Sequence, residues 1–339
     1  MPRTTVYNKD LTENYEKINR KNKKLLDDFI DYCHSMDKTE LTIKNYKSQI
    51  KIFLCWNKKF NKDTFFCDLQ RKDFLTFFGY ARTELKVSPA RIYSFKAALS
   101  SFSTAIEILY EKKYKNFRNL VRDLPSIPQA PVREKTILSV EQVQEMINFF
   151  VEKEDYQIAC YLALLCSSGC RVSEAIQMKA SFFDEKHEVF GGLMYLTDKI
   201  RTKGKGSIGK VIGRYVIKSS FKPYFDLWQK QREKLGVKTD YLFIKITSQE
   251  PADISTANFF VSKINKQFNC DFYNHCARHF MVSQLKRLGL TTEDIKEVMK
   301  WSDVKMVEIY DDSSSEERIH NVFTKLEKRQ KEAEGEKNE

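Results

Sequence analysis

Residues 124–135 read LPSIPQAPVREK and separate two differently patterned parts of this 339-residue chain. Three prolines fall within the first eight of these residues, and each proline removes an amide donor and disfavours helix. A chain of this length, 42% of it hydrophobic, can bury more than one core. We therefore predict two domains joined by this proline-rich segment.

The part before the linker has apolar residues at helical spacing. One apolar stripe runs from Leu25 to Cys33, and Thr42 is placed to cap a second helix. A later helix is expected to begin at Ser88 and Pro89, because serine can cap a helix and proline fits its first turn. No strand-like alternation interrupts this part, so residues 24–122 are predicted to form a bundle of four or five helices.

The part after the linker mixes helices with strands. Ser139 and Gln142 form a capping box that begins its first helix. Residues 192–199 and 211–217 alternate well enough to be two strands, joined by a turn rich in glycine and lysine. Helical patterns predict further helices at 157–168, from about 173, and at 221–235, 254–268, 273–288 and 292–300. The predicted fold class is mainly α with a small β-sheet.

The domain boundaries follow from these patterns. The predicted division is a basic N-terminal segment 1–23, a helical domain 24–123, a linker 124–136, a mixed domain 137–315, and a C-terminal helix with a charged tail 316–339. The last helix carries a short apolar stripe that consists of Ile319, Val322, Phe323 and Leu326. This stripe suits docking on a neighbouring copy of the chain or packing on its own domain, and the sequence favours neither.

The composition bears on partners and location. A formal charge of +12 suits a polyanion, because binding releases counterions from phosphates, although charge alone does not identify nucleic acid as the partner. The basic N-terminus does not resemble a signal peptide, and no apolar run approaches the roughly 20 residues that span a bilayer. An intracellular protein without a membrane partner is expected, and its cysteines should be reduced.

A metal site is a weak alternative for the cysteines. The sequence has no CxxC pair, so a zinc ribbon is disfavoured. Cys166 and Cys170 would share a helix face, and His275 with Cys276 could complete a site. Structural zinc ligands rarely have such spacings, and we predict no metal and no cofactor.

Five sequence features follow one another in the second domain. They are SGCRVSE at 168–174, RTKGKG at 201–206, HCAR at 275–278, Trp301, and Tyr310 nine residues after this tryptophan. This ordered set resembles the tyrosine recombinase (phage integrase) family, including Cre-type and Xer-type enzymes. The family pattern is an arginine followed by an acid, a hairpin lysine, HxxR, a histidine or tryptophan, and a nucleophilic tyrosine. The resemblance covers about residues 139–323, and the N-terminal half looks like the family's helical core-binding domain.

The residue types also suit cleavage of a phosphodiester. Arg171 and Arg278 can neutralise the charge that develops on the non-bridging oxygens, and arginine stays charged at any working pH. A free tyrosine phenol has a pKa of about 10, so Tyr310 needs a cationic pocket or a base to attack. Each residue alone has a simpler reading, since Arg171 could pair with Glu174 on a helix surface and Tyr310 could be a packing residue. Their ordered combination favours the catalytic interpretation.

The general acid that protonates the leaving 5′-oxygen is ambiguous. Lys205 matches a GKG form of the hairpin motif and is slightly favoured, whereas Lys203 matches the RTK form of Cre-type enzymes. Lys210 is a more distant candidate, and all three could be nonspecific phosphate contacts.

The other polar residues of the predicted site have supporting roles. Trp301 can donate one hydrogen bond but cannot shuttle a proton, so any acid–base help is expected from His275. His279 is read as a core or structural histidine, and Glu174 is expected to orient His275 or an arginine.

The resemblance implies a site-specific recombinase that cuts and rejoins double-stranded DNA through a 3′-phosphotyrosyl link on Tyr310. It further implies a homotetramer on paired sites, exchange through a Holliday junction, accessory DNA-bending factors, and a cytoplasmic, nucleoid-associated location. Integration or excision of a mobile element is the expected task. A Walker-type motif is absent from the sequence, and the reaction needs neither ATP nor metal. The alternatives are a type IB topoisomerase, a catalytically silent DNA-binding relative, and an unrelated basic helical adaptor.

Overall fold

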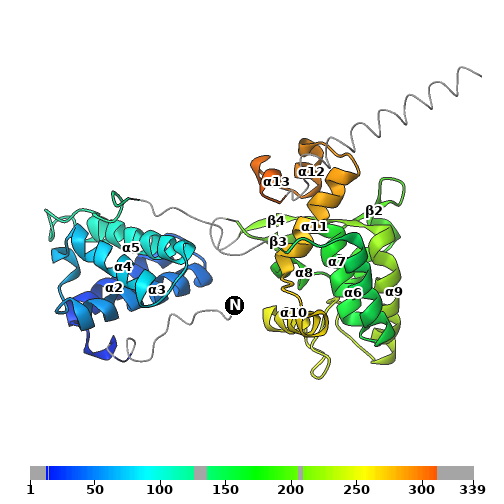
Figure 1. Ribbon diagram of the computed structural model, residues 1–339, viewed down its shortest axis with the longest axis horizontal. Coiled ribbons are helices and arrows are strands. Elements are labelled where there is room, and N and C mark those ends of the chain that lie inside the picture. Colours follow the sequence, from blue (N-terminus) through cyan, green and yellow to red (C-terminus); the bar gives the residue numbers. More distant parts are fainter. Residues whose placement is uncertain (1–12, 14, 126–135, 205–208, 311–339) are drawn as a thin grey trace, which may run out of the picture. The chain divides into compact units, whose positions relative to one another are not determined.

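The computed structural model describes residue 13 and residues 15–125, 136–204 and 209–310. The described residues fall into two compact units. The first unit contains the residues up to Pro125, and the second contains residues 136–203 and 209–310 (Figure 1). Each unit has its own hydrophobic core.

The first unit is a bundle of helices. Its elements are a 3₁₀ turn η1 (Tyr15–Lys17), α2 (Arg20–Ser35), α3 (Glu40–Phe60), a 3₁₀ turn η2 (Phe66–Asp68), α4 (Arg71–Thr83) and α5 (Pro89–Leu109). Ser88 caps α5 and Pro89 occupies its first turn, as the sequence predicts. The prediction that Thr42 caps α3 is wrong, because the Thr39 hydroxyl accepts the hydrogen bond from the Thr42 amide, 3.2 Å away. The cap three residues earlier adds nearly one more turn to the helix.

Aromatic rings fill the core of the first unit. Phe53 lies at the centre, 5.0 Å from Phe77 and 5.4 Å from Phe74 between ring centroids. Phe66, from the 3₁₀ turn after α3, packs 4.6 Å from Phe102 of α5. These rings bury large apolar areas and join α3, α4 and α5 into one body.

The second unit surrounds one buried helix. Its helices are α6 (Val140–Glu152), α7 (Tyr156–Ser168), α8 (Val172–Ala175), α9 (Lys218–Lys234), α10 (Ile254–Phe268), α11 (Asn274–Arg287), α12 (Thr292–Val298) and α13 (Lys305–Tyr310). Short 3₁₀ turns η3 (Ala180–Phe183) and η4 (Glu185–His187) follow α8. Every residue of α7 after Tyr156 is buried, and α6, α9 and α11 pack around this helix (Figure 1). An apolar helix of this kind is stable only inside a core.

Five short strands form two separate sheets beside these helices. Strands β1 (Glu188–Val189), β2 (Met194–Leu196) and β5 (Tyr215–Ile217) make an antiparallel sheet in the order β1-β2-β5. Strands β3 (Ile200–Thr202) and β4 (Lys210–Ile212) pair as an antiparallel hairpin, with Thr202 opposite Lys210. The prediction of a mainly helical fold with little β-structure is therefore confirmed.

The predicted pair of longer strands, 192–199 and 211–217, is wrong in detail. The second strand breaks at Gly213, where an added Cβ would lie 2.6 Å from the Thr197 carbonyl oxygen. The next residue, Arg214, bonds through its backbone to Thr197 instead of continuing the hairpin ladder. Its side chain is buried, with 1% of its surface exposed. Alternation within the segment could not reveal that an arginine turns into the interior.

Among the described residues, no helix is long and apolar enough to cross a membrane.

The end of α7 has a tight glycine. Gly169 caps the helix at φ +58°, and an added Cβ would lie 2.7 Å from the Met299 Cε atom and 3.3 Å from Met281. We predict that Gly169→Ala lowers the free energy of unfolding by at least about 1–2 kcal/mol, the cost of the left-handed conformation alone. Urea unfolding followed by circular dichroism measures this change.

Gly79 in α4 provides the matched control. An added Cβ at Gly79 meets nothing within 4 Å, so Gly79→Ala should stabilise the helix by about 0.5–1 kcal/mol. Equal effects of the two substitutions on stability would refute the role assigned to the α7 cap.

Candidate active site

The first arginine of the predicted site lies just beyond the end of α7. Arg171 is the N-cap of α8, and its backbone amide donates to a Glu174 carboxylate oxygen at 2.8 Å. The Arg171 Nη1 atom donates to the other oxygen of this carboxylate at 3.0 Å. In the turn from α7 into α8, the backbone amide and the guanidinium of Arg171 are therefore both held by the Glu174 carboxylate.

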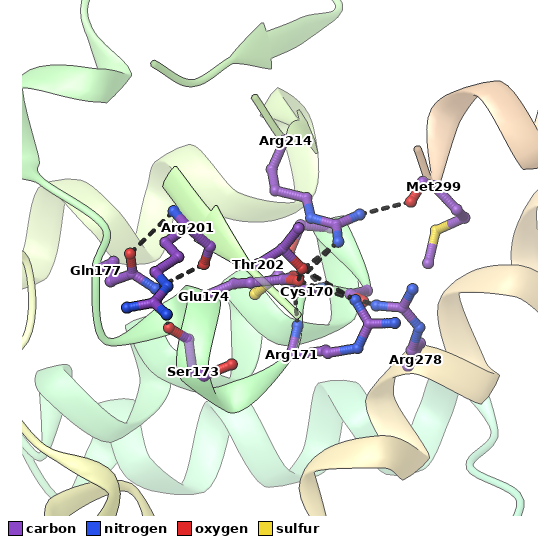
Figure 2. Close-up of polar contacts among 12 residues, drawn as sticks. Cys170, Arg171, Ser173, Glu174, Gln177, Arg201, Thr202, Arg214, Arg278 and Met299 are labelled. Atoms are coloured by element: carbon purple, nitrogen blue, oxygen red, sulfur yellow. Dashed lines mark hydrogen bonds and ion pairs between the residues drawn. The ribbon is translucent and has the colours of Figure 1, made fainter. Parts of the chain in front are cut away.

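Glu174 is a buried hub that joins three segments of the second unit. Its carboxylate, which has no exposed surface, also accepts hydrogen bonds from Thr202 on β3 and from Arg214 Nη2, the latter at 2.9 Å (Figure 2). Burial alone would raise the pKa of Glu174, but the charge and hydrogen bond of Arg214 and the bonds from Thr202 and Arg171 lower this pKa to about 2. Glu174 is thus ionised at neutral pH.

Arg214 is a part of the site that the sequence analysis missed. Besides contacting Glu174, it donates from Nη1 to the Met299 carbonyl oxygen at 2.6 Å (Figure 2). The signal that could have revealed it is a lone charge inside the apolar run Val211–Ile217, because a charge buried in such a run requires a partner.

The second predicted arginine, Arg278, lies in α11 with 1% of its surface exposed. Its Nη1 atom donates to the Gly169 carbonyl oxygen at 2.6 Å. Its Nε and Nη2 atoms are buried and have no hydrogen-bond partner in the part of the chain that the structure describes. Desolvation and the charges of Arg171 and Arg214 lower the pKa of Arg278 to about 10, so it remains a cation at neutral pH.

Aromatic rings cover this arginine. The Arg278 guanidinium carbon lies 4.9 Å from the Trp301 ring centroid and 5.4 Å from that of Tyr310. Trp301 stacks on Tyr310 at 5.2 Å, and the His279 ring lies 4.7 Å from Tyr310. The Trp301 Nε1 atom is buried without a partner among the described residues. Tyr310, the last residue of α13, is therefore placed directly beside the buried arginine.

His275 is an exposed residue in the first turn of α11, with its ring centroid 6.4 Å from that of Tyr310. Partial desolvation, followed by the charges of Arg278 and Arg171, lowers the pKa of His275 below its usual value of 6.5. At neutral pH its imidazole is therefore uncharged and can accept a proton, and it stays so as the pH falls through 6.5.

This electrostatic setting gives a testable pH dependence. We predict that the His275 pKa, followed by proton NMR and assigned with His275→Gln, lies below 6.5 in the native chain and rises in Arg171→Gln. Lys266→Gln removes a charge that is not among the main causes of the His275 shift and should leave its pKa in place. An unchanged His275 pKa in Arg171→Gln would contradict the proposed electrostatic cause.

The structure says less about the lysine candidates and the C-terminal stripe. Lys203 is exposed and follows directly after Thr202, which binds Glu174, and Lys210 lies on β4. Lys205 lies outside the described residues, as do the apolar stripe and the connector 311–315. The choice between Lys203 and Lys205 therefore stays open.

The described candidates meet at one site in the second unit. The end of α7 and α8 supply Arg171 and Glu174, α11 supplies His275 and Arg278, and the segment after α12 brings Trp301 and Tyr310 to them. Figure 2 shows the Arg171 and Arg278 side chains close together, and Glu174 joined to both Arg171 and Arg214. Among the described residues, no group of three or more His, Cys, Asp or Glu could hold a metal ion. The arrangement places two arginine side chains, including the Arg278 donors that lack a partner in the described part of the chain, next to a tyrosine.

Known proteins are similar to this chain in sequence and in fold. The sequence profile of the phage integrase family matches residues 136–317, and that of the phage integrase N-terminal SAM-like domain matches residues 25–109. The SPbeta prophage-derived recombinase-like protein YomM of Bacillus subtilis (strain 168) is 29% identical over 262 residues, which cover 75% of each chain.

Two solved structures show the same fold. The Tn1549 transposon integrase in complex with circular intermediate DNA is 14% identical and has a TM-score of 0.65, with 88% of this chain and 98% of that chain covered. A lambda integrase dimer bound to a core site is 16% identical and has a TM-score of 0.62, with 86% and 96% covered. The chain therefore belongs to the phage integrase family of tyrosine recombinases.

Proposed function

We propose that this chain cuts and rejoins double-stranded DNA at specific sites through a covalent bond between Tyr310 and a DNA 3′-phosphate. The observation that carries the proposal is the pair of buried Arg278 nitrogens, Nε and Nη2, without partners among the described residues and beside the Tyr310 ring. Buried polar groups are nearly always satisfied, so donors of this kind indicate a ligand that accepts hydrogen bonds. A phosphate group fits two guanidinium groups bidentately.

In the proposed reaction, the Tyr310 oxygen attacks the phosphorus and the bond from phosphorus to the 5′-oxygen breaks. Arg171 and Arg278 neutralise the charge on the non-bridging oxygens, and the Trp301 indole donates a further hydrogen bond. His275 accepts the phenolic proton, and Lys205 or Lys203 supplies a proton to the leaving oxygen. One phosphoester replaces another, so the reverse reaction rejoins DNA without an energy source.

The same proposal extends to assembly and biological role. The first unit would hold the DNA as a core-binding domain, mainly through phosphate contacts. Four copies on paired sites would exchange strands through a Holliday junction, joined by the stripe at Ile319, Val322, Phe323 and Leu326. The prophage and transposon origins of the similar proteins support integration or excision of a mobile element, which would place the protein at the nucleoid in the cytoplasm.

Covalent trapping tests the proposal. The protein is incubated with a supercoiled plasmid that carries the DNA flanking its own gene, then denatured in detergent and separated on a gel. We expect a protease-sensitive adduct at a 3′-phosphate, and mass spectrometry of the digested adduct should locate the bond on Tyr310. Absence of an adduct on DNA that the protein demonstrably binds would instead favour a catalytically silent DNA-binding relative. Relaxation of any plasmid regardless of its sequence would favour a topoisomerase.

A further inference from the structure

We infer that Arg214 is a positioning residue for DNA cleavage, which acts as the counterion of Glu174 and thereby leaves the charge of Arg171 available to the DNA phosphate. This inference rests on the proposed cleavage reaction. This task differs from that of Arg171 and Arg278, because Arg214 is a buried cation from the segment after β4, and its Nη2 atom donates to the same Glu174 oxygen that Arg171 Nη1 contacts (Figure 2).

The contacts of Arg214 hold it in place independently of DNA. Its backbone amide donates to the Thr197 hydroxyl at 2.9 Å, and its carbonyl oxygen accepts from the Thr197 amide at 3.0 Å. Its Nη1 atom is held by the Met299 carbonyl oxygen, and only Nη2 is directed at Glu174. With 1% of its surface exposed, Arg214 cannot itself be a DNA contact. Its guanidinium is fixed in the position that the Glu174 carboxylate requires.

The charges around Glu174 show why this counterion matters. Arg171, Arg214 and Arg278 supply three positive charges, and Glu174 supplies one negative charge next to Arg171. If residue 214 were neutral, the charge of the Glu174 carboxylate would have to be balanced by Arg171, which also forms an ion pair with it, and by the nearby Arg278. Arg171 and Arg278, which together form the phosphate clamp, would then offer the phosphate about one unit of positive charge less. In a buried setting a unit charge has a large effect.

The ionisation of Glu174 supports this division of tasks. The charge and hydrogen bond of Arg214 are the largest of the influences that lower its pKa, and the backbone amide of Arg171 contributes a further hydrogen bond. Arg171 keeps 25% of its side-chain surface exposed, while Glu174 and Arg214 are almost fully enclosed. The enclosed pair thus balances its own charges, and Arg171, which contacts Glu174 and Thr202 through Nη1, keeps the rest of its partly exposed guanidinium accessible to a ligand.

A double-mutant cycle tests the inference in the full chain. The variants are Arg214→Met, Glu174→Gln and the two combined, and the measurement is the single-turnover rate of adduct formation on the plasmid described above. With Glu174 charged, Arg214→Met should slow cleavage by about 100-fold, while DNA half-saturation stays within about threefold. In the Glu174→Gln background, the same change should alter the rate by less than about threefold. A loss of similar size in both backgrounds would overturn the inference.

Two further measurements keep the outcome interpretable. Arg232 is a buried arginine in the same unit that donates to the backbone carbonyls of Thr239, Tyr241 and Leu242, so folded Arg232→Met should cleave at the native rate. If Arg214→Met alone does not fold, the cleavage rate of the combined variant is compared with that of Glu174→Gln. Equal rates support the inference, and a combined variant that is about 100-fold slower than Glu174→Gln overturns it.

Failure of the proposed function would look different. The native chain would then form no adduct at all. The inference would instead be tested by the affinity for orthovanadate, a tetrahedral oxyanion, measured by calorimetry. Loss of orthovanadate binding in Arg171→Gln would show that the anion binds at the site that contains Arg171. Arg214→Met should weaken this binding at least tenfold, and the combined variant should restore it. Equal affinities of the native chain and Arg214→Met would overturn the inference.

Discussion

Tyr310→Phe is expected to abolish covalent attachment to DNA while the fold and the DNA affinity remain unchanged. The substitution removes only the phenolic oxygen and keeps the ring that stacks on Trp301 and lies against the tilted His279 ring. Without a nucleophilic oxygen no phosphotyrosyl bond can form, so the adduct should fall below detection, a loss larger than that from any change in the phosphate clamp. Denaturing gels and a binding titration on the same plasmid measure the two properties.

Tyr224 offers the matched control for this experiment. It lies on α9, and its hydroxyl accepts a hydrogen bond from the Gln144 side chain away from the site. Tyr224→Phe should form the adduct at the native rate. A normal adduct in Tyr310→Phe would show that another residue attacks the phosphate, and the role assigned to Tyr310 would have to be abandoned.

The second large effect concerns the buried arginine clamp. Arg278→Lys is expected to slow cleavage by about 10³-fold or more, because an ammonium group cannot bind the Gly169 carbonyl and two phosphate oxygens in one plane. The positive charge is retained, so DNA binding should weaken much less than cleavage. Single-turnover rates and half-saturation concentrations of the native chain and the variant separate the two effects.

Arg232→Lys is the control for losing a buried guanidinium. It should lower stability, since Arg232 binds three backbone carbonyls, without slowing cleavage by the folded fraction. If Arg278→Lys and Arg232→Lys reduced cleavage only in proportion to the loss of folded protein, the clamp interpretation of Arg278 would be untenable.

The local patterns in the sequence were sufficient to predict most helices. Ser88 with Pro89, and Ser139 with Gln142, begin helices where the side-chain chemistry indicates. Such signals are local, because a cap and the amide it satisfies lie within three residues of each other. The choice of Thr39 over Thr42 was missed, since two threonines at this spacing are equally good caps until the rest of the helix is packed.

The site was predictable only where its residues belong to ordered motifs. The spacing of Arg171, Arg278, Trp301 and Tyr310 allowed them to be singled out, and the structure brings them to one site. Arg214 was missed because its partners, Glu174 and Met299, are far away in the sequence. The break at Gly213 that turns it inward depends on the same long-range contacts. Alternating patterns report which residues face a core, but not which charge pairs with which.

The attachment of the β3–β4 hairpin has a consequence for protein engineering. The chain leaves the Glu174 carboxylate at Thr202, the last residue of β3, and returns to it at Arg214, two residues after β4, so both residues are fixed on one side chain. A longer or shorter loop between the strands changes the ends of this segment little, and extra loop length costs only a slowly growing closure entropy. Reporter groups or grafted loops inserted between β3 and β4 should therefore leave Arg171 in place, as long as they keep Lys203 and Lys205, the two candidates for the general acid.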